Sequence, residues 1–493
     1  MTNYTQRAVK GFFWVFLMTM LGAVIGYVYR MVLARNLTVE EYGLFYSLYA
    51  FMSLLFLFRG LGMGQALVTY ISKYIANEKL SEAKIVFNYC VKIIGATSVV
   101  LATSALILSK YIAIHYLHSV ELVFEVRLFS LLFLFQGIDQ TMAQILTAFQ
   151  KHFKYASFQF IRQILSLIIV IPLLKFGLKI QAPIFSYIIT SLTLLVLYFS
   201  WFGKKLIPKI KRINKNKSIT KQLWTFGLPT IFASLGGLLL QNIDTFMISI
   251  LKTTSDVGIY NSAVPISSIL IYVSTAVSTV MIPMTSELWA KKMYTHLKEG
   301  IEQIYKYLLL VTLPLVGIIT ILSKEIVILL FGKQYIAGGA VLKILIFAGL
   351  MGLLSTTNFN VLFAIGETKK IAQYTLFGGA INFLLNLLLI PALGLKGAAI
   401  TTVIGYTLMF VLGFIHVKSK TKVTFNKGHF LVIFIGAITT AIGIIINSQF
   451  KINNLISGAL FVLVLAIIYC SILITTKTVT VKEIKELKSK FIS

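Results

Sequence analysis

The sequence has little charge, few acids and almost no cysteine. Only 12% of its 493 residues are charged and 16 are acidic, whereas about one quarter of a typical soluble domain is charged. So little charge cannot cover the surface of a water-soluble domain of this length, which excludes a soluble enzyme. The two cysteines, Cys90 and Cys470, lie far apart in apolar stretches without a CxxC or Cys/His cluster. This excludes a disulfide framework and a zinc site.

What the sequence does contain is apolar residues, which make up 58% of the chain and give a mean hydropathy of +0.88. A membrane-spanning helix needs about 20 consecutive apolar residues. Apolar runs bounded by charges therefore predict an all-α integral membrane protein with fourteen transmembrane helices. The expected spans are 11–33, 43–70, 86–108, 122–148, 153–175, 181–202, 223–251, 257–286, 304–323, 340–365, 371–391, 394–417, 429–447 and 455–475.

The formal net charge of +29 is unevenly distributed along the chain. Connections on the side of the N-terminus hold most of the 45 Lys and Arg, including eight between Lys204 and Lys221, and the acids do not share this bias. By the positive-inside rule, both termini are expected to be cytoplasmic in a multi-pass protein of the cell membrane. Membrane topology then explains the excess charge, and no nucleic-acid partner is expected.

The second half of the chain resembles the first. At an offset of 215 residues, Glu41–Phe45 falls on Asp256–Tyr260, and at an offset of 219, Lys151 falls on Lys370. Two such copies predict pseudo-symmetric six-helix lobes that rock about a central site, as in many transporters. The predicted division is an N-terminal lobe 1–202, a basic cytoplasmic connection 203–222, a C-terminal lobe 223–417, two further spans in 418–475 and a basic cytoplasmic tail 476–493.

Arginine is rare, yet it is concentrated inside the spans. Of the 45 Lys and Arg only seven are Arg, and four of these fall within predicted spans: Arg30, Arg59, Arg127 and Arg162. An Arg at the bilayer centre costs about 2.5 to 3.5 kcal/mol on the insertion scale. Snorkelling can relieve Arg30 and Arg127 near the outer helix ends. Arg59 and Arg162 are deeper, and we expect them to face an aqueous cavity or an acid.

A guanidinium group binds phosphate through paired hydrogen bonds and keeps its charge when desolvated. The four arginines are therefore candidate contacts for an anionic head group, with Arg59 and Arg162 foremost. A structural alternative is equally open for Arg162, because Asp139 lies at a similar depth on the neighbouring helix and would neutralise it. Asp244, in span seven, is a candidate for charge pairing, for binding a coupling proton or sodium ion, or for capping a broken helix.

Three glycines follow Arg59 at alternate positions: Gly60, Gly62 and Gly64. They favour either a helix break beside the cavity or close helix packing. No catalytic constellation is present, because the sequence has no Walker loop and its six His lack metal-ligand spacing. We therefore expect a transporter rather than an enzyme, with no catalytic residue, no metal site and no resident cofactor, and with a coupling cation (proton or sodium) left open.

Several segments resemble one family in order and spacing. They are Leu33–Phe45, Phe226-Gly227-Leu228-Pro229 with Asp244, Val257–Ala263 and Leu330–Tyr335. Together they resemble the polysaccharide transporters of the multidrug/oligosaccharidyl-lipid/polysaccharide exporter superfamily, the lipid-linked oligosaccharide flippases. The resemblance covers almost the whole chain, with one departure at Asn36-Leu37, where the family commonly has Leu-Gly.

The resemblance implies a V-shaped pair of six-helix bundles around a cationic cavity. The implied function is to translocate an isoprenoid-phosphate- or isoprenoid-diphosphate-linked oligosaccharide from the cytoplasmic to the outer leaflet by alternating access. Implied partners are this lipid-linked substrate, membrane lipid and other glycan-assembly membrane proteins. Two alternatives are a cation-coupled multidrug exporter of the same superfamily and a membrane-embedded glycan polymerase or transferase. Four span arginines against two aspartates make a cationic drug the less natural cargo.

Overall fold

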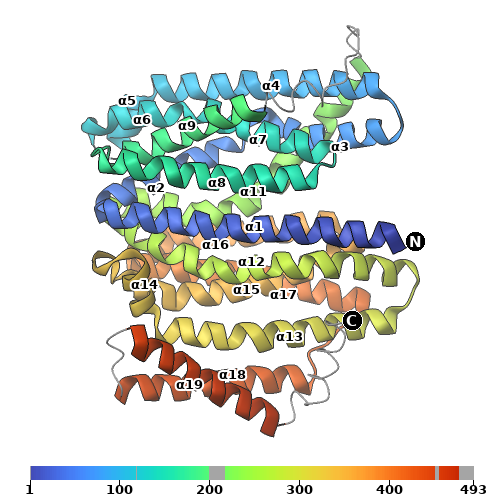
Figure 1. Cartoon of the computed structure of the whole chain (residues 1–493), viewed down its shortest axis with the longest axis vertical. Helices are drawn as coiled ribbons and strands as arrows, with labels where there is room; N and C mark the ends of the chain where they lie inside the picture. The colour runs from blue at the N-terminus through green and yellow to red at the C-terminus, as the bar shows by residue number, and fades with distance from the viewer. Residues whose placement is uncertain (1, 118, 199–216, 450–454, 477–493) are drawn as a thin grey trace. The chain divides into compact units, whose positions relative to one another are not determined.

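The computed structural model describes residues 2–117, 119–198, 217–449 and 455–476, which are helical almost throughout and contain no β-strand. This confirms the all-α prediction. The chain forms two compact units, residues 1–261 and 262–493, and each is described by itself (Figure 1). The boundary between the units falls inside helix α12 (Thr254–Ala290). The expected lobe limits at residues 202 and 223 differ from this boundary. They stay a prediction of which segments move together during transport.

The first unit is built from long helices joined by short connections. They are α1 (Thr2–Asn36), α2 (Val39–Phe56), η1 (Arg59–Gly62), α3 (Met63–Ala76), α4 (Leu80–Ile107), α5 (Ser109–His115), η2 (Val120–Leu122), α6 (Val123–Ser130), α7 (Leu132–Ala148), α8 (His152–Lys175), α9 (Gln181–Tyr198), α11 (Lys217–Leu251) and the start of α12. Helix α1 packs along α8, and α11 packs against α2, α3 and α4 (Figure 1). Apolar side chains such as Leu67, Val86 and Leu223 form a buried core where α3, α4 and α11 meet.

The second unit contains the rest of α12 and the helices that follow it. They are α13 (Tyr294–Ile321), α14 (Ser323–Phe331), η4 (Lys333–Tyr335), α15 (Gly338–Ala364), α16 (Thr368–Leu393), α17 (Leu395–Thr421), α18 (Lys427–Gln449) and α19 (Leu455–Thr475). Helix α15 is buried along most of its length and contacts α13, α16 and α17. Helix α18 packs between α13 and α19. The core of this unit is therefore centred on α15.

Eleven helices among the described residues are long and apolar enough to cross a membrane, or twelve if α2 and the bent segment after it count as one span. The expected count of fourteen is not confirmed. The expected span 122–148 is divided between η2, α6 and α7. The expected span 257–286 lies within the 37-residue helix α12. Apolar composition predicted where helices lie, but not where one helix is interrupted.

The first turns of α2 and α12 have the same capping pattern. Thr38 accepts a hydrogen bond from the Glu41 backbone N–H (3.1 Å), and the Thr38 N–H donates to the Glu41 carboxylate (3.0 Å). At the offset of 215, Thr253 and Asp256 make the same two bonds, each at 3.2 Å. Reciprocal bonds of this kind satisfy helix-end N–H groups that would otherwise lack partners. The two copies of the expected repeat therefore begin these helices in the same way.

These two helix starts also pack on each other through equivalent glycines. A Cβ atom on Gly43 would lie 1.8 Å from the carbonyl oxygen of Thr254, and one on Gly258 would lie 2.3 Å from that of Val39. Gly43 and Gly258 are separated by the repeat offset, as are Val39 and Thr254. The contact is therefore reciprocal, as a local two-fold relation requires. Only residues without a side chain permit backbones to approach this closely.

Candidate functional site

A helix break, one of the two arrangements expected for the glycines after Arg59, is present. Helix α2 ends at Phe56, η1 follows, and the segment up to Ala76 is bent by 44° relative to α2. Gly60 and Gly62 have φ angles of 74° and 77°, and Leu61 between them has 49°. Glycine adopts this left-handed region without steric cost, whereas other residues rarely do. The Gly60 N–H, left without a helical partner, donates to the Thr97 hydroxyl at 2.8 Å.

Close packing, the other interpretation of the glycines, is present as well. A Cβ atom on Gly62 would lie 1.9 Å from the backbone oxygen of Gly227 in α11. A Cβ atom on Gly64 would lie 2.2 Å from the side-chain amide of Gln144 in α7. The glycines therefore both break the helix and bring α11 and α7 close to the break. The break and the packing are two parts of one arrangement.

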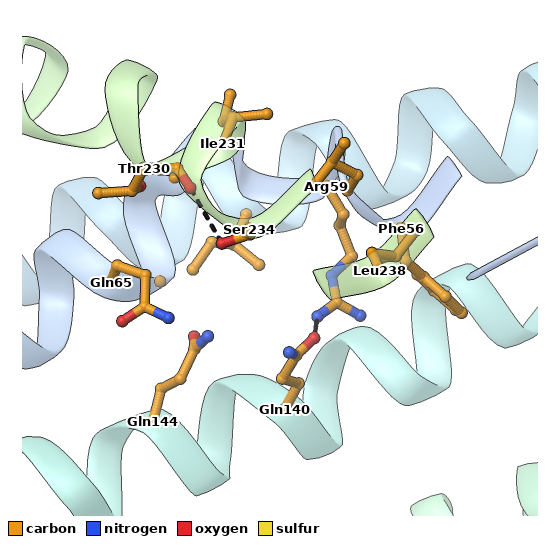
Figure 2. A pocket seen from close by; sticks show the side chains of 13 residues that line it. Phe56, Arg59, Gln65, Gln140, Gln144, Thr230, Ile231, Ser234 and Leu238 are labelled. Carbon is orange, nitrogen blue, oxygen red and sulfur yellow. Dashed lines mark hydrogen bonds between the residues drawn. The ribbon is translucent and has the colours of Figure 1, made fainter. Parts of the chain in front are cut away.

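Arg59 lies at this break and lines a cavity of about 190 Å³, here called the polar cavity. Its Nη2 group donates a hydrogen bond to the Gln140 side-chain oxygen, and its guanidinium carbon lies 5.1 Å from the centroid of the Phe56 ring (Figure 2). Its Nε atom is enclosed without a hydrogen-bond partner among the described residues. Of the two surroundings expected for Arg59, an aqueous cavity or an acid, this placement corresponds to a cavity.

The other polar side chains of the polar cavity are neutral. They are Gln65 on α3, Gln140 and Gln144 on α7, and Thr230 and Ser234 on α11 (Figure 2). Among the described residues that line this cavity, Arg59 is the one charged side chain. At about 30 Å³ per water, the volume holds roughly six waters. The cavity therefore offers one fixed positive charge beside several uncharged donors and acceptors.

Asp139 precedes Gln140 on α7 but its carboxylate points to a different neighbour. The Ser191 hydroxyl of α9 donates to it at 2.6 Å, and its side chain is 5% exposed. It interacts electrostatically with both Arg162 and Arg59. Within the described residues, however, neither guanidinium lies within ion-pair distance of it, and its Oδ1 atom has no hydrogen-bond partner. A direct Asp139–Arg162 ion pair, one of the two alternatives for Arg162, is therefore not formed among the described residues.

The remaining predicted arginines lie outside the polar cavity. Arg162 does not line it, and its Nε atom is enclosed without a hydrogen-bond partner among the described residues. The Arg30 guanidinium lies 5.0 Å from the centroid of the Tyr46 ring. Arg127 is exposed and donates from Nε to the Ser109 hydroxyl at 3.2 Å.

Asp244, the candidate acid of α11, is also buried. Its carboxylate accepts a 2.7 Å hydrogen bond from the hydroxyl of Tyr260 in the first turns of α12. One residue further along each helix, the Asn261 amide donates to the Thr245 hydroxyl at 3.2 Å. These bonds tie α11 to α12. This partner is a neutral hydroxyl, so pairing with a cation, binding of a coupling ion and capping of a broken helix all stay predictions for Asp244.

Sequence reasoning missed the glutamines of the polar cavity. Gln65, Gln140 and Gln144 carry no charge, so a search for charges inside apolar runs passes over them. The available signal was the spacing of Gln140 and Gln144, which are four residues apart and therefore share one helix face. Two amides on one face of an apolar span indicate that this face contacts water or other polar groups at that depth.

Comparisons with known proteins give a consistent result. The profile of the family described as "Polysaccharide biosynthesis protein" matches residues 8–289, and that of MatE matches residues 229–388. An uncharacterized membrane protein of Methanocaldococcus jannaschii is 29% identical over 99% of both chains. A probable low-salt glycan biosynthesis flippase, Agl15 of Haloferax volcanii, is 24% identical over 64% of this chain and 64% of its own length.

Solved structures share the fold. The lipid II flippase MurJ in an inward closed conformation has a TM-score of 0.73 at 18% identity, covering 94% of this chain and 98% of its own. An inward-facing multidrug resistance MATE family transporter of the MOP superfamily has a TM-score of 0.66 at 18% identity, covering 81% of this chain and 94% of its own. The matched families and the shared fold define a multi-pass membrane transporter of the multidrug/oligosaccharidyl-lipid/polysaccharide exporter superfamily. Within it, the chain belongs to the polysaccharide biosynthesis protein family.

Proposed function

We propose that this transporter flips an isoprenoid-phosphate- or isoprenoid-diphosphate-linked oligosaccharide from the cytoplasmic to the outer leaflet by alternating access. The observation that carries the proposal is the position of Arg59 at a helix break in a polar cavity. A sugar head group cannot leave water for hydrocarbon without losing its hydrogen bonds. A polar cavity within the protein supplies replacements, while the isoprenoid tail stays in lipid.

Arg59 suits the phosphate of such a substrate. Gln140 and Phe56 hold the guanidinium in place, which reduces the side-chain entropy that binding an anion would otherwise cost. A guanidinium stays charged in such a site and binds phosphate oxygens in pairs. Asp139, within electrostatic reach, offsets the charge when no anion is bound. Arg162, expected with Arg59 as a foremost contact, and Arg30 and Arg127, expected as secondary ones, stay candidate contacts for the head group, although they lie outside the polar cavity.

The named relatives support a lipid-linked sugar as the substrate. One is described as a probable glycan biosynthesis flippase and one structural neighbour as a lipid II flippase. The proposal includes cytoplasmic termini, because the basic connections lie on their side of the chain. It also includes a coupling cation, proton or sodium, with Asp139 and Asp244 as candidate groups, and contact with other glycan-assembly membrane proteins.

A cation-coupled multidrug exporter is the second candidate. The MatE match over residues 229–388 and the buried carboxylates of Asp139 and Asp244 favour it. A cationic drug would need an acid in the binding cavity, whereas the charged side chain lining the described polar cavity is Arg59. The two functions therefore predict cargo of opposite charge.

The test is a flipping assay in liposomes that contain the purified chain and a labelled polyprenyl diphosphate oligosaccharide. Losing a paired, charge-assisted contact of about 3 kcal/mol should slow flipping by roughly a hundredfold in Arg59→Ala. Arg59→Lys should retain part of the rate, since it keeps the charge but loses the paired geometry. Lys110→Ala removes an exposed positive charge outside the cavity and serves as the control.

Wild-type flipping by Arg59→Ala at equal incorporation would contradict the anion-binding role. Movement of cationic dyes, but not of the labelled lipid, would support the multidrug exporter. Formation of glycosidic bonds by the purified chain would indicate an enzyme of glycan assembly instead.

A further inference from the structure

The neutral part of the polar cavity lies beside Arg59 and consists of three glutamines and two hydroxyl groups. Gln65 and Gln140 are exposed and Gln144 is partly exposed, although all three lie in helices of a membrane-embedded unit. In Figure 2 their side chains extend into one space from α3 and α7, with Thr230 and Ser234 across from them on α11. Exposed amides at this depth face water or a ligand rather than lipid.

The hydrogen bonds already made leave a definite set of groups unused. The Gln140 side-chain oxygen accepts from Arg59, so its NH₂ group is directed away from the guanidinium. Within the described residues, Gln65 and Gln144 make no side-chain hydrogen bond. The Gln144 amide is seated where a side chain at position 64 would lie, which fixes its place in the wall. Three amides are thus available to a ligand.

The hydroxyl groups of Thr230 and Ser234 can only accept hydrogen bonds from a ligand, because each already donates its hydrogen to its own helix. Thr230 donates to the Gly227 carbonyl oxygen at 2.6 Å, and Ser234 donates to the Thr230 carbonyl oxygen at 2.9 Å. A hydroxyl whose hydrogen is engaged by its own helix can still accept through its lone pairs. An ionised phosphate has no hydrogen to offer such acceptors. A sugar hydroxyl both donates and accepts, and therefore matches this wall.

From this arrangement we propose that Gln65, Gln140 and Gln144, with Thr230 and Ser234, form a subsite for the first sugar ring, the one attached to the phosphate held by Arg59. This proposal rests on the proposed function, and it adds which part of the substrate each group binds. The volume of about 190 Å³ is comparable to that of one sugar ring and smaller than that of a chain of sugars. The protein would then distinguish substrates by the identity of the sugar next to the phosphate.

The experiment compares binding of two probes to the purified full chain in nanodiscs. One is a polyprenyl phosphate, and the other is the same lipid carrying one sugar, taken from glucose, mannose, N-acetylglucosamine and glucuronic acid. The variants are Gln65→Ala with Gln144→Ala together, and Gln136→Ala as the matched control. Gln136 lies one turn before Gln140 on α7 and does not line the polar cavity.

The wild-type chain should bind at least one of the glycosylated lipids about tenfold more tightly than the bare phosphate, the effect of one or two neutral hydrogen bonds. The double variant should lose this preference and bind the bare phosphate as the wild type does. Gln136→Ala should keep the preference, and Arg59→Ala should weaken both probes together. Equal unfolding temperatures for the variants would show that the loss is not one of folding.

Two results would overturn the subsite. One is a wild-type chain that prefers no sugar in the panel, and the other is a preference that survives in the double variant. Either result leaves binding of the bare phosphate, and so the proposed function, intact. Conversely, a sugar preference that depends on the glutamines, in a chain that moves no lipid across liposomes, would sustain the subsite while refuting the flippase.

Discussion

Each compact unit contains a cavity, and the two differ in chemistry. The second unit has a cavity of about 370 Å³ between α13, α18 and α19, here called the apolar cavity, lined by side chains such as Leu315, Ile318 and Leu465. Its few polar groups are engaged: the Thr440 hydroxyl donates to the Gly436 carbonyl at 2.8 Å and the Tyr469 hydroxyl to the Leu310 carbonyl at 3.0 Å. The polar cavity is about half that volume, yet its amides and Arg59 have unused hydrogen-bonding capacity.

The comparison teaches that unused polar groups, and not volume, mark the site. An apolar cavity binds apolar groups without direction, because burial of hydrocarbon surface is not directional. A cavity that keeps unpaired amides in a membrane protein retains groups whose desolvation costs free energy. Such groups are tolerated where a ligand or water completes their hydrogen bonds. Substitutions in the two cavities, and at the helix break beside the polar cavity, should therefore differ in their effect on stability.

The largest expected effect concerns the helix break. Gly62→Ala combines a left-handed φ of 77° with a Cβ only 1.9 Å from a backbone oxygen of α11, so we expect a loss of more than about 3 kcal/mol in stability. Gly177→Ala has a similar φ of 80° but open space around its Cβ, so only the conformational cost of about 1 to 2 kcal/mol applies. Thermal unfolding in detergent measures both. Equal losses would mean that the contact with α11 is unimportant.

The next largest expected effect is the difference in stability when a glutamine is introduced into each cavity. Leu465→Gln buries an amide in the apolar cavity, where its residue is 3% exposed, and should cost about 2 to 3 kcal/mol. Leu238→Gln adds an amide to the polar cavity, where partners or water are present, and should change stability by less than about 1 kcal/mol. Unfolding midpoints in the same detergent distinguish them. The reverse order would show that the apolar cavity is the wet one.

The smallest effect lies outside both cavities. Lys420 Nζ lies 2.7 Å from the Glu367 carboxylate. This hydrogen bond, with the charges of Lys420 and His416, lowers the pKa of Glu367. Since the folded pKa is below the unfolded value of about 4.3, the stabilisation is present above that pH and is lost as the pH falls through the folded pKa.

Lys420→Met should therefore lower the unfolding temperature slightly at neutral pH, and the difference from the wild type should vanish near pH 3. The effect should be small because exposed ion pairs contribute little. Flipping should not change, since neither cavity is touched. A difference that grew on acidification would mean that Glu367 is held in its protonated form.

Several features of the site follow from the sequence because they depend on local chemistry. Arg59 inside an apolar run requires compensation, and the alternating glycines beside it are expected to give either a break or close packing; the structure has both. The division of the expected span 122–148 between α6 and α7 could not, because each piece remains apolar and helical. The contact between the Asp139 carboxylate and Ser191 depends on how α7 meets α9, which residue depth alone does not determine.

The glutamines were missed for a different physical reason. An amide disturbs the hydropathy of a span only slightly, so Gln65 and Gln144 leave almost no signal in a search for charge. Their significance comes from convergence: residues from three helices meet at one cavity beside Arg59. Convergence is a property of packing between distant segments. The family resemblance indicated the class of protein, whereas the residues around the Arg59 charge became evident only from the structure.

The mutual close approach of Gly43 and Gly258 makes each helix start depend on the other. Each glycine is the surface on which the other helix rests, so an added methyl group at one position strikes a carbonyl oxygen belonging to the other copy. Neither position can accept a larger side chain unless the facing backbone moves away. A bulkier residue at either position is therefore expected to displace both helix starts at once.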